Sequence, residues 1–130
     1  MKILFVEDDP MNRRVVRDML RVVGAAMDEA PDAETGLQMI DDASFNIVLM
    51  DLRMPGMDGL TAIKHLRART DEKATLPVIV VTADTAIDLR ERCLANGADD
   101  VLSKPVAMGA LLNAVGRMVA RSAGDDIVLS

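Results

Sequence analysis

The stretch Ile47-Val48-Leu49-Met50-Asp51 places an acid directly after four consecutive apolar residues. An uninterrupted apolar run of this length is typical of a strand that is buried on both faces of a parallel sheet. Similar runs occur at residues 3–6 and 78–81. We therefore predict buried strands over residues 2–6, 46–50 and 77–82.

Working outward from these runs, two further strand patterns cover residues 26–30 and 100–103. Segments with helical spacing of apolar residues separate all five strands. Strict alternation of strand and helix predicts an α/β domain in which a parallel sheet carries helices on both faces. We predict five helices. The first starts at Asp9–Pro10 and is closed by Gly24, the second runs from an Asp32 cap through Ile40, and the third runs from an Asp58 cap through Arg69. The fourth covers residues 86–96 before Gly97, and the fifth covers residues 107–121.

Composition narrows the class of protein. The 130 residues are enough for one domain, and half of them are hydrophobic, so a packed core is expected. No apolar run is long enough to span a membrane, and a single cysteine, Cys93, excludes an internal disulfide. The net charge of -6 argues against direct nucleic-acid binding. We expect a cytoplasmic protein without membrane or nucleic-acid partners.

The last residues differ from the rest of the chain. Residues 122–130 show no helical pattern, and no second domain is evident in the sequence. We therefore expect one domain over residues 1–121, a short C-terminal tail over residues 122–130, and no output domain.

Polar residues gather where the predicted strands end. Glu7 and Asp8 follow the first strand, Asp51 follows the third, Thr82 ends the fourth, and Lys104 follows the fifth. Sites in open parallel sheets form beyond the carboxyl ends of the strands, so these side chains should converge. Two carboxylates about 4 Å apart repel by about 4 kcal/mol at an effective dielectric constant near 20. A lysine and a divalent cation relieve such repulsion, and oxygen ligands are those that Mg²⁺ prefers.

Four motifs in this order resemble the response-regulator receiver domain. They are Val6-Glu7-Asp8, the segment from Leu49 to Gly59 that contains Asp51, Val81-Thr82-Ala83, and Lys104-Pro105. The similarity covers residues 2 to about 120 and is closest to the chemotaxis-type, single-domain two-component response regulators. It implies a flavodoxin-like, doubly wound sheet of five parallel strands in the order 2-1-3-4-5, with five helices.

The resemblance also implies a metal-dependent phosphoacceptor. Asp51 would take the phosphoryl group. Asp8, Asp51 and the backbone carbonyl of Arg53 would hold Mg²⁺, and Glu7 would reach the metal through a water molecule. Opposite charges on Arg53 and Asp84 would border the site, and we expect this pair to tune the lifetime of the phosphoryl group.

The remaining motif residues would bind the phosphoryl group and report its presence. By the same resemblance, Thr82 and Ala83 would contact phosphoryl oxygens, Lys104 would balance their charge, and a cis peptide bond before Pro105 would orient the lysine. Many receivers carry an aromatic residue at the position of Val101. Without a ring there, we expect the signal to travel through the loop of residues 83–87 and the fourth helix.

The resemblance implies a signalling protein rather than an enzyme, although one that assists its own phosphorylation and dephosphorylation. A histidine kinase or a histidine phosphotransfer protein would be the donor, and a separate downstream protein would read the output. We expect the donor to dock beside the first helix, where Arg13 and Arg17 would meet its acids.

Three other functions remain open at this stage. The domain would act as a phosphorelay shuttle or phosphate sink if it passes the group to or from a histidine phosphotransfer protein. A metal-dependent phosphatase with an Asp nucleophile usually carries a second acid where this chain has Arg53. A binding module that is never phosphorylated tends to lose an acid or the lysine, and this chain keeps Asp8, Asp51 and Lys104.

Overall fold

A computed structural model describes the backbone of residues 1–129 and the side chains of residues 1–122. Five parallel strands form one sheet in the order β2-β1-β3-β4-β5, as expected. Their bounds are β1 Lys2–Val6, β2 Ala26–Ala30, β3 Ile47–Asp51, β4 Val78–Thr82 and β5 Asp100–Ser103.

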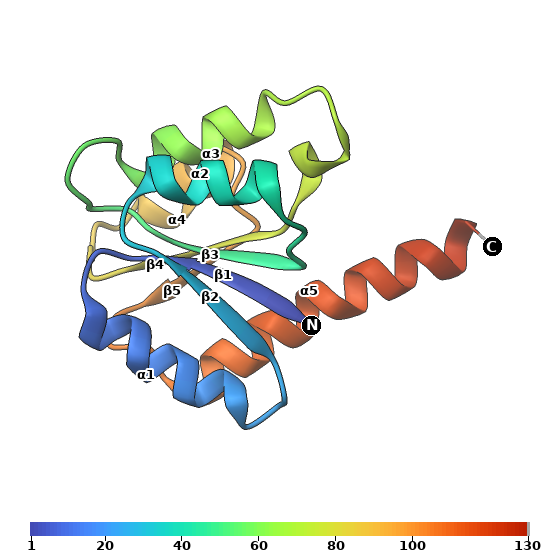
Figure 1. Ribbon diagram of the computed structural model, residues 1–130, viewed down its shortest axis with the longest axis horizontal. Helices are drawn as coiled ribbons and strands as arrows, with labels where there is room; N and C mark the ends of the chain where they lie inside the picture. The colour runs from blue at the N-terminus through green and yellow to red at the C-terminus, as the bar shows by residue number, and fades with distance from the viewer. Residues whose placement is uncertain (130) are drawn as a thin grey trace.

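Helices cover both faces of the sheet (Figure 1). On one face lie α2, α3 and α4, and on the other lie α1 and α5. A short 3₁₀ helix, η1, precedes β4. The bounds are α1 Pro10–Arg21, α2 Ala33–Asp42, α3 Gly59–Arg67, η1 Glu72–Thr75, α4 Leu89–Ala95 and α5 Met108–Leu129.

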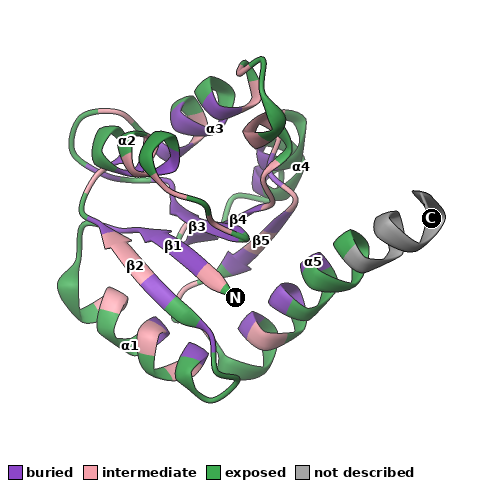
Figure 2. Ribbon diagram, turned by 45° about the vertical axis from the view of Figure 1, so that its right-hand side comes forward, coloured by how far each residue is buried: buried purple, intermediate pink, exposed green. Residues whose placement is uncertain are grey.

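The two sides of the sheet form two separate apolar clusters. Ile63, Leu66 and Cys93 belong to the cluster under α2, α3 and α4, whereas Val16 and Leu111 belong to the cluster under α1 and α5. Figure 2 shows the central strands largely buried between the helices, whereas β2 at one edge is mostly of intermediate burial or exposed. Every residue of β3 and β4 is buried, which confirms the prediction from their continuous apolar runs.

Aspartate side chains cap the first three α-helices. The side chain of Asp9 accepts a hydrogen bond from the backbone N–H of Met11, and Asp32 and Asp58 cap α2 and α3 in the same way. The three caps predicted from sequence are therefore confirmed. They fix where each helix starts relative to the strand before it, and so set the loops that surround the carboxyl edge of the sheet.

Two helix bounds differ from the sequence prediction by more than two residues. Helix α4 begins at Leu89 rather than at residue 86, because the side chain of Asp84 binds the backbone N–H of Ala86 and holds a turn there. Helix α5 continues to Leu129, so the expectation of a tail without helix is wrong up to that residue. No proline follows Pro105 to interrupt the helical hydrogen bonds. Residue 130 lies outside the described residues.

Among the described residues, none of the helices combines the length and the apolar character that a membrane span requires.

Gly59 lets α3 begin directly against the end of β3. Its backbone N–H donates to the carbonyl oxygen of Leu52 at 3.0 Å. A Cβ at this position would collide with the carbonyl oxygen of Asp51 and would lie 2.9 Å from the Cα of Leu52. Because both obstacles are backbone atoms, a side chain here would displace the loop that carries Asp51.

We predict that Gly59→Ala lowers the free energy of unfolding by about 1–3 kcal/mol, as expected for overpacking. Gly116→Ala is the matched control, because a Cβ on Gly116 of α5 meets nothing within 4 Å. That change should stabilise the fold by up to about 1 kcal/mol through helix propensity. Urea denaturation of both variants tests this, and equal stability of Gly59→Ala and the wild type would disprove the close approach.

Candidate functional site

An open cleft lies at the carboxyl edge of the sheet, over the ends of β1, β3, β4 and β5. The sequence-predicted site residues Glu7, Asp8, Asp51, Arg53, Thr82, Ala83, Asp84 and Lys104 all line this cleft. Pro105 lies just outside it and lines a neighbouring small pocket instead. The parallel sheet therefore brings together residues that are distant in the sequence.

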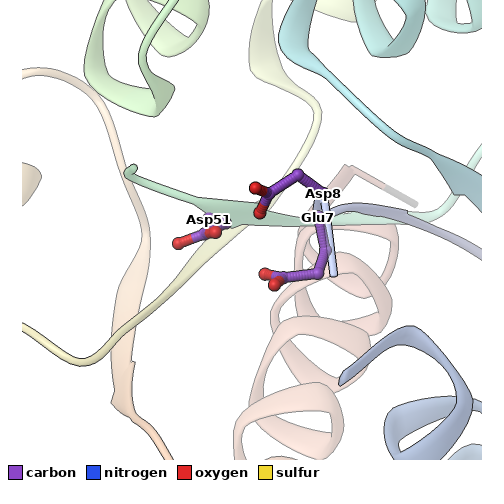
Figure 3. A group of neighbouring side chains, drawn as sticks. All are labelled: Glu7, Asp8 and Asp51. Carbon is purple, nitrogen blue, oxygen red and sulfur yellow. The ribbon is translucent and has the colours of Figure 1, made fainter. Parts of the chain in front are cut away.

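Three carboxylates meet in the cleft. Glu7 and Asp8 directly follow β1, and Asp51 is the last residue of β3. Figure 3 shows the carboxylates of Glu7 and Asp8 on the side that faces Asp51. One carboxylate oxygen from each of the three lies within 4.8 Å of the others. Glu7 and Asp51 are buried, whereas Asp8 is exposed to solvent. An all-oxygen set that is open on one side suits a hard divalent cation such as Mg²⁺.

Lys104 faces two of these acids. Its Nζ lies 3.0 Å from Oε2 of Glu7 and 3.3 Å from Oδ2 of Asp51. The peptide bond to Pro105 is cis, as expected, and the backbone N–H of Lys104 donates to the carbonyl oxygen of Thr82. Burial acts to lower the pKa of Lys104, but the hydrogen bond to Glu7 and the charges of Asp51 and Glu7 outweigh it and raise the pKa above its usual value. Lys104 therefore stays protonated.

Asp51 lies in an electrostatically strained position. Burial first, and then the neighbouring Glu7 carboxylate, raise the pKa of Asp51 to about 6, although Lys104 acts in the opposite direction. One lysine does not compensate for three acids. Positive charge that enters the cleft therefore stabilises the ionised carboxylate of Asp51.

Thr82 and Asp84 connect the cleft to the loop before α4. The hydroxyl of Thr82 accepts a hydrogen bond from the backbone N–H of Asp84 at 3.1 Å. The carboxylate of Asp84 accepts one from the backbone N–H of Ala86 at 2.9 Å and lies 3.5 Å from Nη2 of Arg53. The expected Arg53–Asp84 ion pair is therefore present. The backbone N–H of Arg53 in turn donates to Asp51 at 3.4 Å.

The arginines of α1 have a partner within the chain that the sequence did not predict. Arg13 and Arg17, which we expected to meet a docking partner, approach Glu29 of β2 at 3.6 and 3.3 Å. Asn12 was not predicted to belong to the site, yet its side chain donates to the Glu7 carboxylate at 3.0 Å. Both residues were missed from the sequence. Asn12 belongs to no recognisable motif, and nothing in the sequence of β2 marks Glu29 as a partner of the arginines.

Comparisons with known proteins agree with this geometry. The family model described as "Response regulator receiver domain" matches residues 3–116. Among curated proteins, the sensor histidine kinase RcsC of Salmonella typhi is 40% identical over 111 residues, which are 85% of this chain and 11% of that protein. The transcriptional regulatory protein QseB of Haemophilus influenzae is 32% identical over 124 residues, which are 95% of this chain and 55% of that protein.

A solved structure gives a similar result. The receiver domain of the sensor histidine kinase PA1611 from Pseudomonas aeruginosa PAO1 is 32% identical, has a TM-score of 0.82, and aligns with 92% of this chain and 97% of that one. That structure has a magnesium ion coordinated in its active-site cleft. The chemotaxis-type, single-domain subtype expected from the sequence is not confirmed, because the relatives include a sensor kinase and a transcriptional regulator that are much longer than this chain.

We predict that Asp51→Asn stabilises the metal-free protein at neutral pH. Folding raises the pKa of Asp51 from 3.8 to about 6. The free energy of unfolding therefore falls as the pH rises from 3.8 to about 6, and it does not fall further above that pH because of Asp51. The variant should be more stable than the wild type by on the order of 1–3 kcal/mol near pH 7.5. The difference should vanish near pH 3.5, below both pKa values.

Chemical denaturation in the presence of a chelator at the two pH values measures this effect. An equal gain at both pH values would show that packing, rather than ionisation, explains the change.

Proposed function

The chain belongs to the response regulator receiver domain family, and on this premise we propose that Asp51 accepts a phosphoryl group from a phosphohistidine donor in an Mg²⁺-dependent reaction. Receiver domains are signalling modules of two-component systems. The observation that carries the proposal is the cluster of Glu7, Asp8 and Asp51 opposite a protonated Lys104. That arrangement supports the binding of a dianionic phosphoryl group and a divalent cation side by side.

The proposed step is an in-line displacement at phosphorus. A carboxylate oxygen of Asp51 forms the new bond, while the bond from phosphorus to the donor's imidazole nitrogen breaks and that nitrogen keeps the electron pair. Asp8, Asp51 and the backbone carbonyl of Arg53 would hold Mg²⁺, with Glu7 acting through a water molecule. Bound Mg²⁺ offsets negative charge on the transferring oxygens. Lys104 offsets the remainder, because its ammonium already lies 3.3 Å from Asp51.

Phosphorylation would be reported through Thr82. The hydroxyl of Thr82 and the backbone N–H of Ala83 would donate hydrogen bonds to phosphoryl oxygens. Thr82 would have to move toward the phosphoryl group, and this movement would strain the hydrogen bond that the backbone N–H of Asp84 donates to Thr82. The loop between β4 and α4 depends on Asp84 for its turn, and it exposes the whole side chain of Ile87. A downstream protein that binds this loop and α4 would then distinguish the two states. Val101 has no ring to contribute to this route.

A relay role is the second candidate. The specific observation in its favour is that this chain is 40% identical to a segment of a sensor histidine kinase. In that role, the same acyl phosphate would be returned to the histidine of a phosphotransfer protein. The phosphatase alternative loses support, because Arg53 pairs with Asp84 and supplies no second acid beside Asp51.

We predict that acetyl phosphate with Mg²⁺ adds one phosphoryl group to the wild type and none to Asp51→Asn, as measured by intact mass. Chelation of Mg²⁺ should abolish the labelling, because the acid cluster then repels the incoming anion. Asp28→Asn is the matched control, since Asp28 lies in β2 and pairs with Lys2 outside the cleft. Labelling of Asp51→Asn to the same extent as the wild type would refute the proposal.

We further predict that Arg53→Ala and Asp84→Ala hydrolyse the acyl phosphate faster than the wild type, because the ion pair hinders the attacking water. The increase should not exceed about fivefold, since an exposed pair contributes about 0.2–1 kcal/mol. Arg21→Ala, which removes an exposed ion pair with Asp18 on α1, is the control. If the Arg53 and Asp84 variants hydrolyse the acyl phosphate at the same rate as this control, the ion pair does not tune the lifetime of the phosphoryl group.

A further inference from the structure

Both the backbone and the carboxylate of Glu7 are held by hydrogen bonds within the protein. Its carbonyl oxygen accepts a hydrogen bond from Nη1 of Arg13 at 2.7 Å, and its backbone N–H donates to the carbonyl oxygen of Ala30 at 3.0 Å. Its two carboxylate oxygens accept from Asn12 and from Lys104, each at 3.0 Å. Glu7 is only 1% exposed, so solvent contributes little to its orientation. The chain itself therefore decides where this carboxylate points.

Arg13 does not behave as a surface charge. Its side chain is 17% exposed and lies between the carbonyl oxygen of Glu7 and the carboxylate of Glu29. Its buried Nε lies 3.6 Å from Oε1 of Glu29, which is an ion-pair contact rather than a hydrogen bond. Glu29 therefore balances the charge of Arg13, while Nη1 of Arg13 anchors the loop from which Glu7 and Asp8 project.

Asn12 fixes the other end of the same residue. It donates to Oε1 of Glu7, so that Oε2 is left for Lys104. Without Asn12, the carboxylate would be free to turn both oxygens toward Lys104 and to draw that ammonium away from Asp51, which now lies 3.3 Å from it. Asn12 and Arg13 therefore act on the geometry of the acidic cluster without belonging to it.

We propose that Asn12 and Arg13 are positioning residues that hold Glu7 in place and thereby set the affinity of the Glu7–Asp8–Asp51 cluster for a divalent cation. The first turn of α1, which carries Asn12 and Arg13, is stabilised because Asp9 caps it and Pro10 starts it. Groups that orient metal ligands through hydrogen bonds typically change metal affinity by about 10–100-fold when they are removed. The inference rests on the proposed function, since it assumes that the cluster binds Mg²⁺.

The test is the Mg²⁺ affinity of Arg13→Gln and Asn12→Leu, measured by isothermal titration calorimetry on the unphosphorylated protein. The chain has no tryptophan and no tyrosine, so quenching of intrinsic fluorescence is not an option. We expect both variants to bind Mg²⁺ about tenfold more weakly than the wild type. In acetyl phosphate labelling, the Mg²⁺ concentration for half-maximal rate should rise by the same factor, while the maximal rate changes little.

Arg17→Gln is the matched control. Arg17 lies one turn after Arg13 on α1 and also approaches Glu29, at 3.3 Å, but its other hydrogen bond goes to the carbonyl oxygen of Met27 rather than to Glu7. The substitution therefore removes the same charge and the same Glu29 partner without the contact to Glu7. We expect its Mg²⁺ affinity to stay within about twofold of the wild type. Arg13→Lys, which restores a charged donor, should recover part of the loss.

Wild-type affinity in both Arg13→Gln and Asn12→Leu would overturn the inference, as would equal losses in Arg13→Gln and Arg17→Gln. The Asn12→Leu measurement decides the matter alone if Arg13→Gln does not fold. A wild-type chain that binds no Mg²⁺ and takes no phosphoryl group would instead overturn the proposed function. The two failures are thus distinguishable.

Discussion

The mutual repulsion of Glu7, Asp8 and Asp51 is the constraint on which the rest of this domain depends. The sheet forces the three carboxylates to within 4.8 Å of one another, and two of them are buried. Lys104, which directly follows β5, places its ammonium group beside two of these acids, Glu7 and Asp51. The resulting deficit of positive charge makes the cleft receptive to a divalent cation. In the proposed reaction, the cation would let a phosphoryl group approach Asp51 despite the negative charge of that group.

A short series of contacts links the cleft to the loop before α4. Thr82 is the last residue of β4, and its hydroxyl accepts a hydrogen bond from the backbone N–H of Asp84. The carboxylate of Asp84 stabilises the turn before α4 and also approaches Arg53. A phosphoryl group would compete for the Thr82 hydroxyl and would add about -1.5 to -2 charge beside these residues. The loop before α4 exposes Ile87 to solvent, so a partner can read a shift in its position.

Much of this could be predicted from sequence because two simple rules apply. Continuous apolar runs identify strands buried on both faces, and the carboxyl ends of parallel strands meet, so Asp51, Thr82 and Lys104 had to converge. Two details were missed. The side chain of Asp84 binds the backbone N–H of Ala86, so a local turn delays the start of α4. The pairing of Arg13 and Arg17 with Glu29 of β2 depends on the tertiary fold and is encoded by no local pattern.

Chemical identification of the phosphorylated residue tests the central claim most directly. The chain would be phosphorylated by a histidine phosphotransfer protein in the presence of Mg²⁺ and then reduced with borohydride, which converts an aspartyl phosphate into homoserine. Peptide mapping by mass spectrometry then locates the modified residue. The account predicts homoserine at position 51 and nowhere else. Homoserine at Asp8, phosphate on His65, or no modification in the presence of a donor that transfers to other receivers would contradict it.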